Sequence, residues 1–471
     1  MRLLRQTGKE AGILGKGVLI LVKSENKIQI EIEMPKKVRQ IIDALNAQGF
    51  EAFAVGGCVR DSLLGKKPKD WDITTSAKPQ QVKALFAHTI DTGLQHGTVT
   101  VMLGREGFEV TTYRIDGEYT DCRHPKEVTF TPNLREDLMR RDFTMNAMAY
   151  NAKFGLIDLF GGMEDLKNGV IRCVGDPASR FCEDALRMLR AVRFAAQLDF
   201  EVERGTKDAI MRLASSLNKI SAERIAAELV QLVASAHPGR LLDAYAFGIT
   251  KVILPEFDLM METAQNNPHH CYSVGEHTIH AMRQVGQDKI LRLAMLFHDM
   301  GKPECRTTDE NGIDHFHGHP EKGERIAKQV MRRLKLDNDT LRRVGALVRW
   351  HDDNPPLKKE KVRRTVRKVG VAQYPAIFMV KRADILAQSE YKRKEKLDYV
   401  DQYEKLYQDI LNQKDCLDIK QLAITGRDVM ALGVPQGKQV GEMLNQLLEL
   451  TLDDPAKNNR RYLLEQVKKR K

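Results

Sequence analysis

The chain has 471 residues, 42% of them hydrophobic, a length that suits about three domains with cores of their own. Its formal net charge of +11 favours a polyanionic partner, and dense basic stretches such as KKEKVRRTVRK suit a phosphate backbone. No run of about 18 apolar residues is present, which argues against a membrane-spanning helix and favours a cytoplasmic protein. The seven cysteines are dispersed without a CxxC pair, which favours reduced thiols over disulfides or a zinc ribbon.

The first segment, residues 1–33, has a basic start and an apolar patch, GILGKGVLILV, that is too short to span a bilayer. No small-residue cleavage pattern follows it, so we treat it as an N-terminal extension to which the sequence assigns no role. A better-formed helical pattern begins near Met34.

Residues 34–165 mix helical patterns (35–49 and 79–87) with strand-like runs (51–55, 98–103 and 108–114). Beyond about residue 163 amphipathic helical patterns continue to the end. We therefore expect an α+β protein: a head with a small mixed sheet, followed by an all-α neck, body and tail. The expected boundaries, placed with the help of Pro- and Asn-rich breaks, are 34–165, 166–262, 263–400 and 401–471.

Two aspartates stand one position apart in KDWDITTSAKP. On an extended strand Asp70 and Asp72 point to the same side, where like charges repel unless a cation lies between them. Mg²⁺ prefers carboxylate oxygens and bridges them to phosphate, so the pair predicts a two-metal phosphoryl-transfer site. Glu109, on the strand FEVTTYR, is the best third carboxylate, and Asp116 and Asp61 are alternatives.

A glycine-rich turn, VGGCVRD, precedes this pair. Gly56 and Gly57 let backbone N–H groups approach a phosphate at the start of a helix, and Arg60 adds a planar fork of donors. A lone Asp-x-Asp is usually a solvated pair, but the whole stretch from Gly56 to Pro79 resembles the first signature of class II tRNA nucleotidyltransferases, which are the CCA-adding enzymes and the bacterial poly(A) polymerases.

Two further stretches fit the same family. EDLMRRDFTMNAMAYN resembles the family's second signature, which implies that Arg141 reaches the triphosphate and Asp142 a ribose hydroxyl. EDALRMLRAVRFAAQL, at 183–198, resembles its base-reading helix. The resemblance implies a polymerase-β-like head that transfers nucleotides with Mg²⁺ and releases pyrophosphate.

The helix at 183–198 also has a direct chemical interpretation. Asp184 and Arg187 are three apart, and Arg190 and Arg193 continue the same face. Cytosine and adenine both present an amine donor beside a ring-nitrogen acceptor. A carboxylate can accept from the amine and a guanidinium can donate to the ring nitrogen, whereas uracil and guanine would leave the carboxylate and the guanidinium unpaired. The alternative is an ordinary surface ion pair.

A second candidate site lies in the helical body. LRLAMLFHDMGKP places His298 beside Asp299, and His277 and Asp384 complete a pattern that resembles the HD phosphohydrolase superfamily. Two histidines and two aspartates suit a second divalent metal. Buried histidines are more often satisfied core residues, which is the alternative here. His319, from the cluster HFHGH, and His351 are candidates for a further metal or for phosphate contact.

The tail, at 424–454, resembles the segment of these enzymes that holds the acceptor stem and T-loop of the RNA. The resemblance therefore implies addition of CCA to the 3′ end of tRNA from CTP and ATP, with no membrane or DNA partner. The intact segment 113–133 argues against a CC-only enzyme. Alternatives are an A-adding enzyme or poly(A) polymerase, an HD phosphohydrolase with a nucleotide-binding head, and a noncatalytic RNA-binding scaffold.

Overall fold

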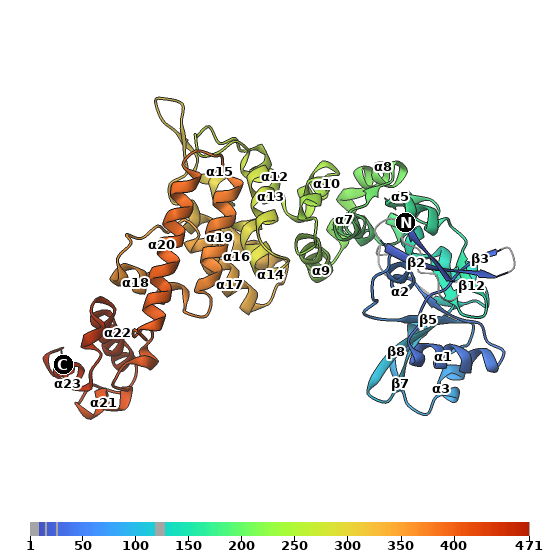
Figure 1. Cartoon of the computed structure of the whole chain (residues 1–471), viewed down its shortest axis with the longest axis horizontal. Coiled ribbons are helices and arrows are strands. Elements are labelled where there is room, and N and C mark those ends of the chain that lie inside the picture. Colours follow the sequence, from blue (N-terminus) through green and yellow to red (C-terminus); the bar gives the residue numbers. More distant parts are fainter. Residues whose placement is uncertain (1–8, 15–16, 25–26, 118–127, 471) are drawn as a thin grey trace. The chain divides into compact units, whose positions relative to one another are not determined.

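The computed structural model describes residues 9–14, 17–24, 27–117 and 128–470, with backbone only up to residue 29 and at Asp116. Contacts divide the chain into two compact units, Met1–Ile253 and Leu254–Lys471 (Figure 1). Among the described helices, none combines the length and the apolar character that a bilayer span requires.

A seven-stranded mixed sheet forms the centre of the first unit (Figure 1). Only the central pair, β5 and β8, is parallel; every other neighbouring pair is antiparallel. From one edge to the other the strands are β12 (Gly155–Asp158), β11 (Met148–Asn151), β4 (Ala52–Val55), β5 (Asp72–Thr75), β8 (Glu106–Thr112), β7 (Thr98–Leu103) and β6 (Thr89–Gly93).

Helices α1 (Lys36–Ala47) and α3 (Pro79–Leu85) pack against strands of this sheet. In α1 the buried residues Val38, Ile41, Ile42 and Leu45 recur at the helical spacing, which gives one apolar face. α1, α3, β4, β7 and β8 lie where the sequence pattern placed two helices and three strands. The segment before the head forms a three-stranded antiparallel sheet of β1 (Lys9–Leu14), β2 (Gly17–Ser24) and β3 (Lys27–Ile30).

The rest of the first unit is mainly helical, and its strands are short. The helices are α2 (Gly57–Leu63), α4 (Leu134–Met139), α5 (Gly162–Asn168), α6 (Pro177–Glu183), α7 (Leu186–Leu198), α8 (Arg204–Leu213), α9 (Ala222–Val233), α10 (Leu241–Ala246) and α11 (Thr250–Ile253). The strands are β9 (Arg114–Asp116), β10 (Val128–Phe130), β13 (Val170–Ile171) and β14 (Glu201–Val202).

One expectation for this region is wrong. Asp184 was placed on one helical face with Arg187, but α6 ends at Glu183 and α7 begins at Leu186, and Asp184 itself has an extended backbone (φ −143°, ψ 101°). The reason is local: Asp184 Oδ1 accepts a hydrogen bond from the backbone N–H of Leu186 at 3.1 Å, so the aspartate satisfies an orphan donor at the start of α7.

The second unit consists almost entirely of helices. They are α12 (Pro255–Glu262), α13 (Val274–Gln284), α14 (Lys289–Phe297), α15 (Lys302–Cys305), α16 (His319–Arg333), α17 (Asn338–Trp350), α18 (Lys359–Val369), α19 (Tyr374–Ala387), α20 (Arg393–Asn412), α21 (Gly426–Ala431), α22 (Lys438–Asp453) and α23 (Arg460–Arg470). Two short strands, β15 (Thr307–Thr308) and β16 (Asp314–His315), pair antiparallel. The fold class expected from the sequence, a mixed-sheet head followed by helices, is confirmed. The expected boundary after residue 400 falls inside α20.

Candidate active sites

The three candidate carboxylates of the head come from the middle of the sheet. Asp72 is the first residue of β5, and the parallel register pairs Ile73 with Val110, which places Asp72 beside Glu109 on the same side of the sheet. Asp70 lies two residues before the strand, and all three carboxylates line one cavity. Both aspartates are exposed. The strand order brings their carboxylates and that of Glu109 together.

The neighbouring carboxylates affect the charge of Asp72. Although the side chain of Asp72 keeps exposed surface, the surrounding protein partly desolvates its carboxyl group and raises its pKa above the ordinary value. The nearby carboxylates of Glu109 and Asp70 raise this pKa further, whereas Arg141 lowers it. A carboxylate group that repels itself in this way suits a hard divalent cation with oxygen ligands. Of the two alternative third carboxylates, Asp61 forms an ion pair with Arg60 at 2.7 Å, and the side chain of Asp116 lies outside the described residues.

A second cavity, of about 500 Å³, adjoins Asp72 and is strongly basic. Seven arginines and only three aspartates line it, so it suits an anionic ligand. It gathers all nine nucleotide-binding candidates of the sequence analysis, namely Gly56, Gly57, Arg60, Arg141, Asp142, Asp184, Arg187, Arg190 and Arg193. It also contains residues that the sequence did not indicate, namely Arg140, Asn146, Phe194 and Arg224.

The glycine turn closes one side of this cavity. Gly56 has φ +81°, and a Cβ placed there would lie 3.2 Å from Nη1 of Arg141, so the turn requires glycine both for its conformation and for the close approach. Arg60 donates to Oδ1 of Asn146 at 2.7 Å and lies over the ring of Phe194 at 5.0 Å. These contacts fix the guanidinium beside the turn.

Asp142 is a buried, fully charged carboxylate in the same cavity. Its Oδ2 accepts from Arg190 at 2.6 and 2.9 Å, and its Oδ1 accepts from the backbone of Phe143 and from Asn146. Burial raises the pKa of Asp142, but Arg190 and the hydrogen bond from Asn146 outweigh this effect and lower it to about 2. The structure therefore holds Asp142 and Arg190 in a fixed orientation.

The two candidate base-reading groups are each held by another partner. The carboxylate of Asp184 accepts hydrogen bonds from both Nη atoms of Arg224, at 3.2 and 2.7 Å. Arg187 donates to the backbone carbonyls of Arg180 at 3.0 Å and Arg140 at 2.9 Å, and to Glu183 at 2.5 Å. Asp184 and Arg187 are thus held by different residues, and not by the direct surface ion pair that was the alternative interpretation. Arg224, from α9, was missed because an arginine on an amphipathic helix has no distinguishing sequence signal.

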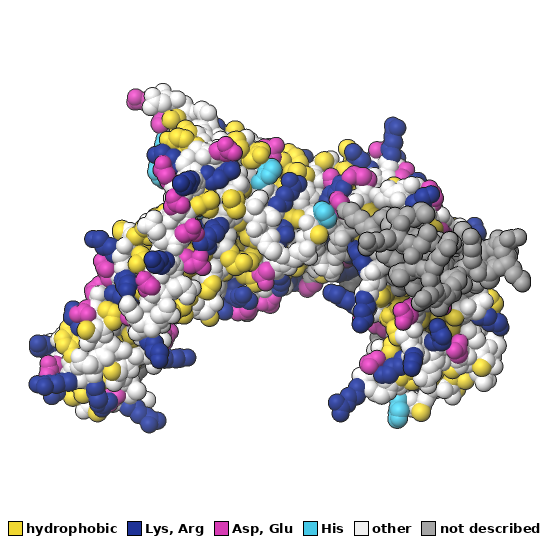
Figure 2. Space-filling model, viewed as in Figure 1, with side chains coloured by type: hydrophobic (Ala, Val, Ile, Leu, Met, Phe, Trp, Pro, Cys, Tyr) yellow, Lys and Arg dark blue, Asp and Glu magenta, His cyan; other side chains and the backbone are white. Residues whose placement is uncertain are grey.

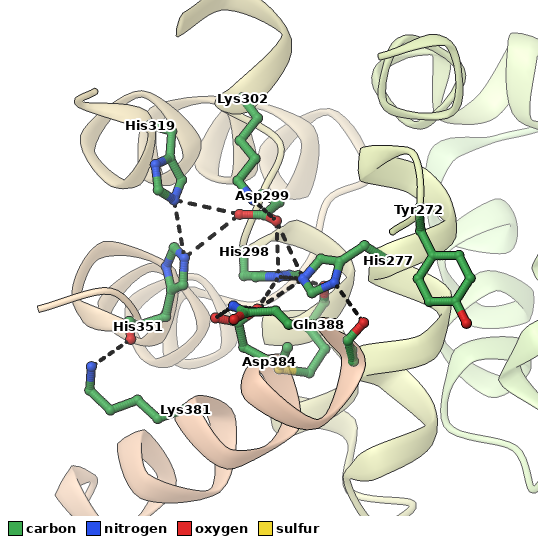
Figure 3. Close-up of polar contacts among 12 residues, drawn as sticks. Tyr272, His277, His298, Asp299, Lys302, His319, His351, Lys381, Asp384 and Gln388 are labelled. Atoms are coloured by element: carbon green, nitrogen blue, oxygen red, sulfur yellow. Dashed lines mark hydrogen bonds and ion pairs between the residues drawn. The ribbon is translucent and has the colours of Figure 1, made fainter. Parts of the chain in front are cut away.

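The HD residues converge from several helices of the second unit (Figure 3). His277 lies on α13, His298 and Asp299 directly follow α14, and Asp384 lies on α19. His277 Nε2 is 2.9 Å from Asp384 Oδ1 and 3.3 Å from His298 Nε2, and His298 Nε2 is 3.3 Å from Asp299 Oδ2. His277, His298 and Asp299 are buried and close enough to hold one metal ion together, and Asp384 borders them.

His319 and His351 join this centre on its other side. His319 begins α16, His351 follows α17, and together with Asp299 they form a second group that is close enough to hold a metal ion. Burial lowers the pKa of His351 to about 3, so its imidazole is neutral at physiological pH. In contrast, His317 is exposed and stacks on His315 rather than entering the centre.

Lysines that the sequence did not indicate surround the same centre. Lys302 Nζ lies 2.7 Å from Asp299 Oδ2, and Lys381 Nζ donates to the carbonyl of His351 at 2.8 Å. A cavity of about 440 Å³ adjoins His351 and Asp384 and is also lined by Lys381, Lys392 and Lys396. Three carboxylates of the same lining, Asp352, Asp384 and Glu395, balance these lysines in number, so the ammonium groups offer local contacts to a phosphate ester beside the candidate metal centre.

The C-terminal part of the second unit carries exposed basic residues. Figure 2 shows Lys and Arg side chains on the surface of this part, and α23 presents Arg460, Arg461, Lys468, Lys469 and Arg470 to solvent. Two of these five have acidic partners: Arg460 contacts Asp428 and Arg461 contacts Glu465. The excess of positive charge fits a phosphate backbone.

Comparisons with known proteins identify the class. Residues 52–172 match the Poly A polymerase head domain, residues 199–261 the probable RNA and SrmB-binding site of polymerase A, and residues 269–389 the HD domain. Together with the mixed sheet and its acidic centre, these matches define a polymerase head joined to an HD domain.

Several curated relatives are CCA-adding enzymes. That of Pediococcus pentosaceus is 34% identical over 433 residues, which cover 92% of this chain and 97% of the relative. The chain therefore belongs to the family of CCA-adding enzymes. Other matches are partial: the chain spans about half the length of the first curated relatives, 58% for that of Lactobacillus helveticus (49% identical, 49% of this chain) and 51% for that of Leuconostoc mesenteroides (51% identical, 43% of this chain).

Solved structures agree on the fold. The Bacillus stearothermophilus CCA-adding enzyme in complex with CTP superposes with a TM-score of 0.71 at 28% identity, covering 93% of this chain and 98% of that one. The Thermotoga maritima CCA-adding enzyme complexed with tRNA shares the fold, with a TM-score of 0.55 at 22% identity, over 93% of this chain and 96% of that one.

Proposed function

We propose that this protein adds the CCA sequence to the 3′ end of tRNA, using CTP and ATP and releasing pyrophosphate. The observation that carries the proposal is the position of Asp72, which lines both the cavity that holds the three carboxylates and the arginine-lined cavity. A nucleoside triphosphate bound by the arginines would thereby bring its α-phosphate to the carboxylates. The relatives named above, including a structure with CTP and one with tRNA, support the same substrates.

Each group around the triphosphate has a distinct role in this proposal. Arg141 and Arg60 bind the phosphates together with the backbone of the glycine turn, and Asp142 accepts from a ribose hydroxyl. Asp70, Asp72 and Glu109 would hold Mg²⁺, which supplies charge neutralisation at the α-phosphate and at the leaving pyrophosphate. The primer's 3′ hydroxyl then attacks the α-phosphorus in line, and the bond to pyrophosphate breaks.

Base selection follows from the fixed orientation of Asp184 and Arg187. Because Arg224 holds Asp184 and backbone carbonyls hold Arg187, little orientational freedom is lost when a base enters. The carboxylate accepts from the exocyclic amine of cytosine or adenine, and the guanidinium donates to the ring nitrogen. Uracil and guanine leave both groups unpaired, at a cost of roughly 1–3 kcal/mol each.

The acceptor is placed by the C-terminal region in this proposal. The exposed basic residues of α23 contact the phosphates of tRNA, and such contacts weaken steeply with added salt. The proposed substrates also imply a cytoplasmic enzyme.

The decisive experiment supplies tRNA that ends at the discriminator base with labelled CTP, ATP or both. We expect two additions with CTP alone and three with both. Addition of A only to tRNA that already ends in CC would identify an A-adding enzyme, long A tracts a poly(A) polymerase, and no incorporation would overturn the proposal.

A second activity is supported by a separate observation. His277, His298 and Asp299 form a buried group that could hold one metal ion, and Asp384 borders it. A cavity of about 440 Å³, within the range of small-ligand sites, adjoins this group and carries three lysines in its lining. We therefore propose that the HD centre is a metal-dependent phosphohydrolase. Release of p-nitrophenol from mono- and bis(p-nitrophenyl) phosphate, or opening of a 2′,3′-cyclic phosphate, tests this activity. His298→Ala should abolish any hydrolysis that is observed. If the unaltered protein hydrolyses none of these substrates with Mn²⁺, Ni²⁺ or Mg²⁺, the proposal is refuted.

A further inference from the structure

The basic stretch KKEKVRRTVRK, residues 358–368, forms most of α18, and its arginines contact protein. Arg363, Arg364 and Arg367 all reach residues 413–470, the part of the chain that follows α20 and that we call the C-terminal segment. Figure 1 shows α18 beside α22 of this segment, and the two helices are in contact. The composition of the stretch favours a phosphate backbone as its partner, whereas the structure gives all three arginines protein acceptors.

Arg363 is 4% exposed, and its guanidinium donates to three acceptors of the C-terminal segment. Nη1 donates to Asp415 Oδ2 at 2.8 Å, Nε to the carbonyl of Leu452 at 2.6 Å, and Nη2 to the carbonyl of Asp453 at 3.0 Å. Leu452 and Asp453 are the last two residues of α22. The last carbonyls of a helix lack partners within the helix and carry negative partial charge, so a buried guanidinium stabilises this helix end.

The other two arginines pair with a polar stripe on α22. Asn445, Glu449 and Asp453 are spaced by four residues and therefore share one face of the helix. Arg364 lies 2.8 Å from Asp453 Oδ1 and donates to Glu449 Oε2 at 3.3 Å. Arg367 contacts Glu449 and donates to Asn445 Oδ1 at 2.5 Å. These pairs are partly exposed and each contributes little, so the buried guanidinium dominates the polar contact between the two helices.

We propose that Arg363 is a positioning residue that holds the C-terminal segment, including the basic helix α23, at one angle to the rest of the second unit. α22 ends at Asp453 and α23 begins at Arg460 after one short turn, so a fixed end of α22 also fixes the start of α23. This inference rests on the proposed function, in which α23 contacts the phosphates of tRNA. A segment that is already held at one angle loses less freedom when an acceptor binds, and it therefore binds that acceptor more tightly.

The contact requires the planar fork of arginine. Three separate nitrogens of Arg363 meet three acceptors, which belong to residues 52, 89 and 90 positions away in the chain. A lysine has a single ammonium nitrogen, which keeps the charge beside Asp415 but does not span the same acceptors. Removing the guanidinium alone would leave the carboxylate of Asp415, a residue that is 7% exposed, without this partner. The informative variants are therefore Arg363→Lys and the paired change of Arg363→Gln with Asp415→Asn.

The angle of the segment is measured first, on the full chain and without tRNA. Spin labels are introduced through an unnatural amino acid at Arg342 on α17 and at Glu465 on α23, two exposed positions, and double electron–electron resonance gives the distance between them. We expect one narrow distance distribution in the parent, which is the labelled chain with Arg363, and a broader distribution in both variants. The matched control, Lys361→Gln, removes an exposed charge from the same helix and should keep the narrow distribution.

Kinetics on the unlabelled proteins connect this angle to the reaction. The KM for tRNA should rise by about tenfold or more in both variants, because a segment that pivots holds the acceptor less well. The kcat at saturating tRNA and the KM for CTP should stay unchanged, because the carboxylates and the arginine-lined cavity lie in the head. Lys361→Gln should leave the KM for tRNA unchanged, whereas direct contact of the basic stretch with RNA would raise it in this control as well.

Each outcome decides the question. A narrow distance distribution in either variant, or a broad one with an unchanged KM for tRNA, overturns the positioning role, and so does a KM for tRNA that rises equally in Lys361→Gln. If circular dichroism shows that the paired variant has lost helix, Arg363→Lys decides alone. A parent that incorporates no CTP refutes the proposed function instead, and the distance distributions, which need no substrate, still test whether Arg363 holds the segment.

Discussion

The Asp142–Arg190 pair allows a quantitative prediction for the stability of the head. Asp142→Asn keeps the side chain's shape and the carbonyl oxygen that Phe143 and Asn146 contact, but removes the charge facing Arg190. The pKa of Asp142 falls from 3.8 in the unfolded chain to about 2 in the folded protein, a difference worth about 2.4 kcal/mol at neutral pH. Arg190 is 33% exposed, and solvent screening reduces the expected loss to about 1–2 kcal/mol.

The pH dependence has a defined sign. Because folding depresses the pKa of Asp142, its charge stabilises the head above pH 3.8, and this contribution disappears as the pH falls toward 2. At pH 3 about half of it remains. The difference in free energy of unfolding between the protein with Asp142 and its Asp142→Asn variant should therefore be constant near neutrality and shrink in acid.

The assay uses the two tryptophans of the chain, one in each unit. Trp350→Phe leaves Trp71, which is 9% exposed in the head, as the only reporter of urea unfolding. Asp43→Asn, an exposed site on α1, is the control for the change of charge. Equal stabilities of the Asp142 and Asp43 variants would refute the reasoning.

Three further predictions concern activity. Asp72→Asn should lower CTP incorporation by more than about a hundredfold while CTP still binds in the arginine-lined cavity, as measured by primer extension and equilibrium dialysis; near-normal incorporation would contradict the assignment. Arg224→Ala should loosen Asp184 and raise UTP relative to CTP incorporation by about 5- to 150-fold, whereas an unchanged ratio with a slower rate would indicate a structural role only. His298→Ala should abolish phosphoester hydrolysis and leave CCA addition intact, and parallel loss of both would show that the centres are not independent.

The sequence predicted the fold class and much of the head because local patterns carry the information. One short stretch of about two dozen residues holds both the glycine turn and the Asp-x-Asp pair, and another short stretch holds the second signature. The structure gathers their residues around two cavities that meet at Asp72. The role of these residues in the chemistry stays a prediction. The four HD residues come from distant positions, but each stands in a recognisable local pattern.

The sequence could not predict contacts between residues that are far apart in the chain and stand in ordinary local patterns. Arg224 reaches Asp184 across 40 positions, and Asn146 holds Arg60 across 86. The break at Asp184 was missed because the helical spacing continues through it, whereas the capping bond to Leu186 depends on backbone geometry. Lys302 and Lys381 resemble surface lysines in the sequence and became visible only as buried neighbours of the HD centre.

A crystal structure with a nonhydrolysable CTP analogue and Mn²⁺ tests the central claim most directly, because manganese can be located by its anomalous scattering. The account predicts the triphosphate against Arg60 and Arg141, the base at Asp184 and Arg187, and manganese between the α-phosphate and the carboxylates of Asp70 and Asp72. A nucleotide bound elsewhere, or a triphosphate in the arginine-lined cavity with no manganese at those carboxylates, would contradict it.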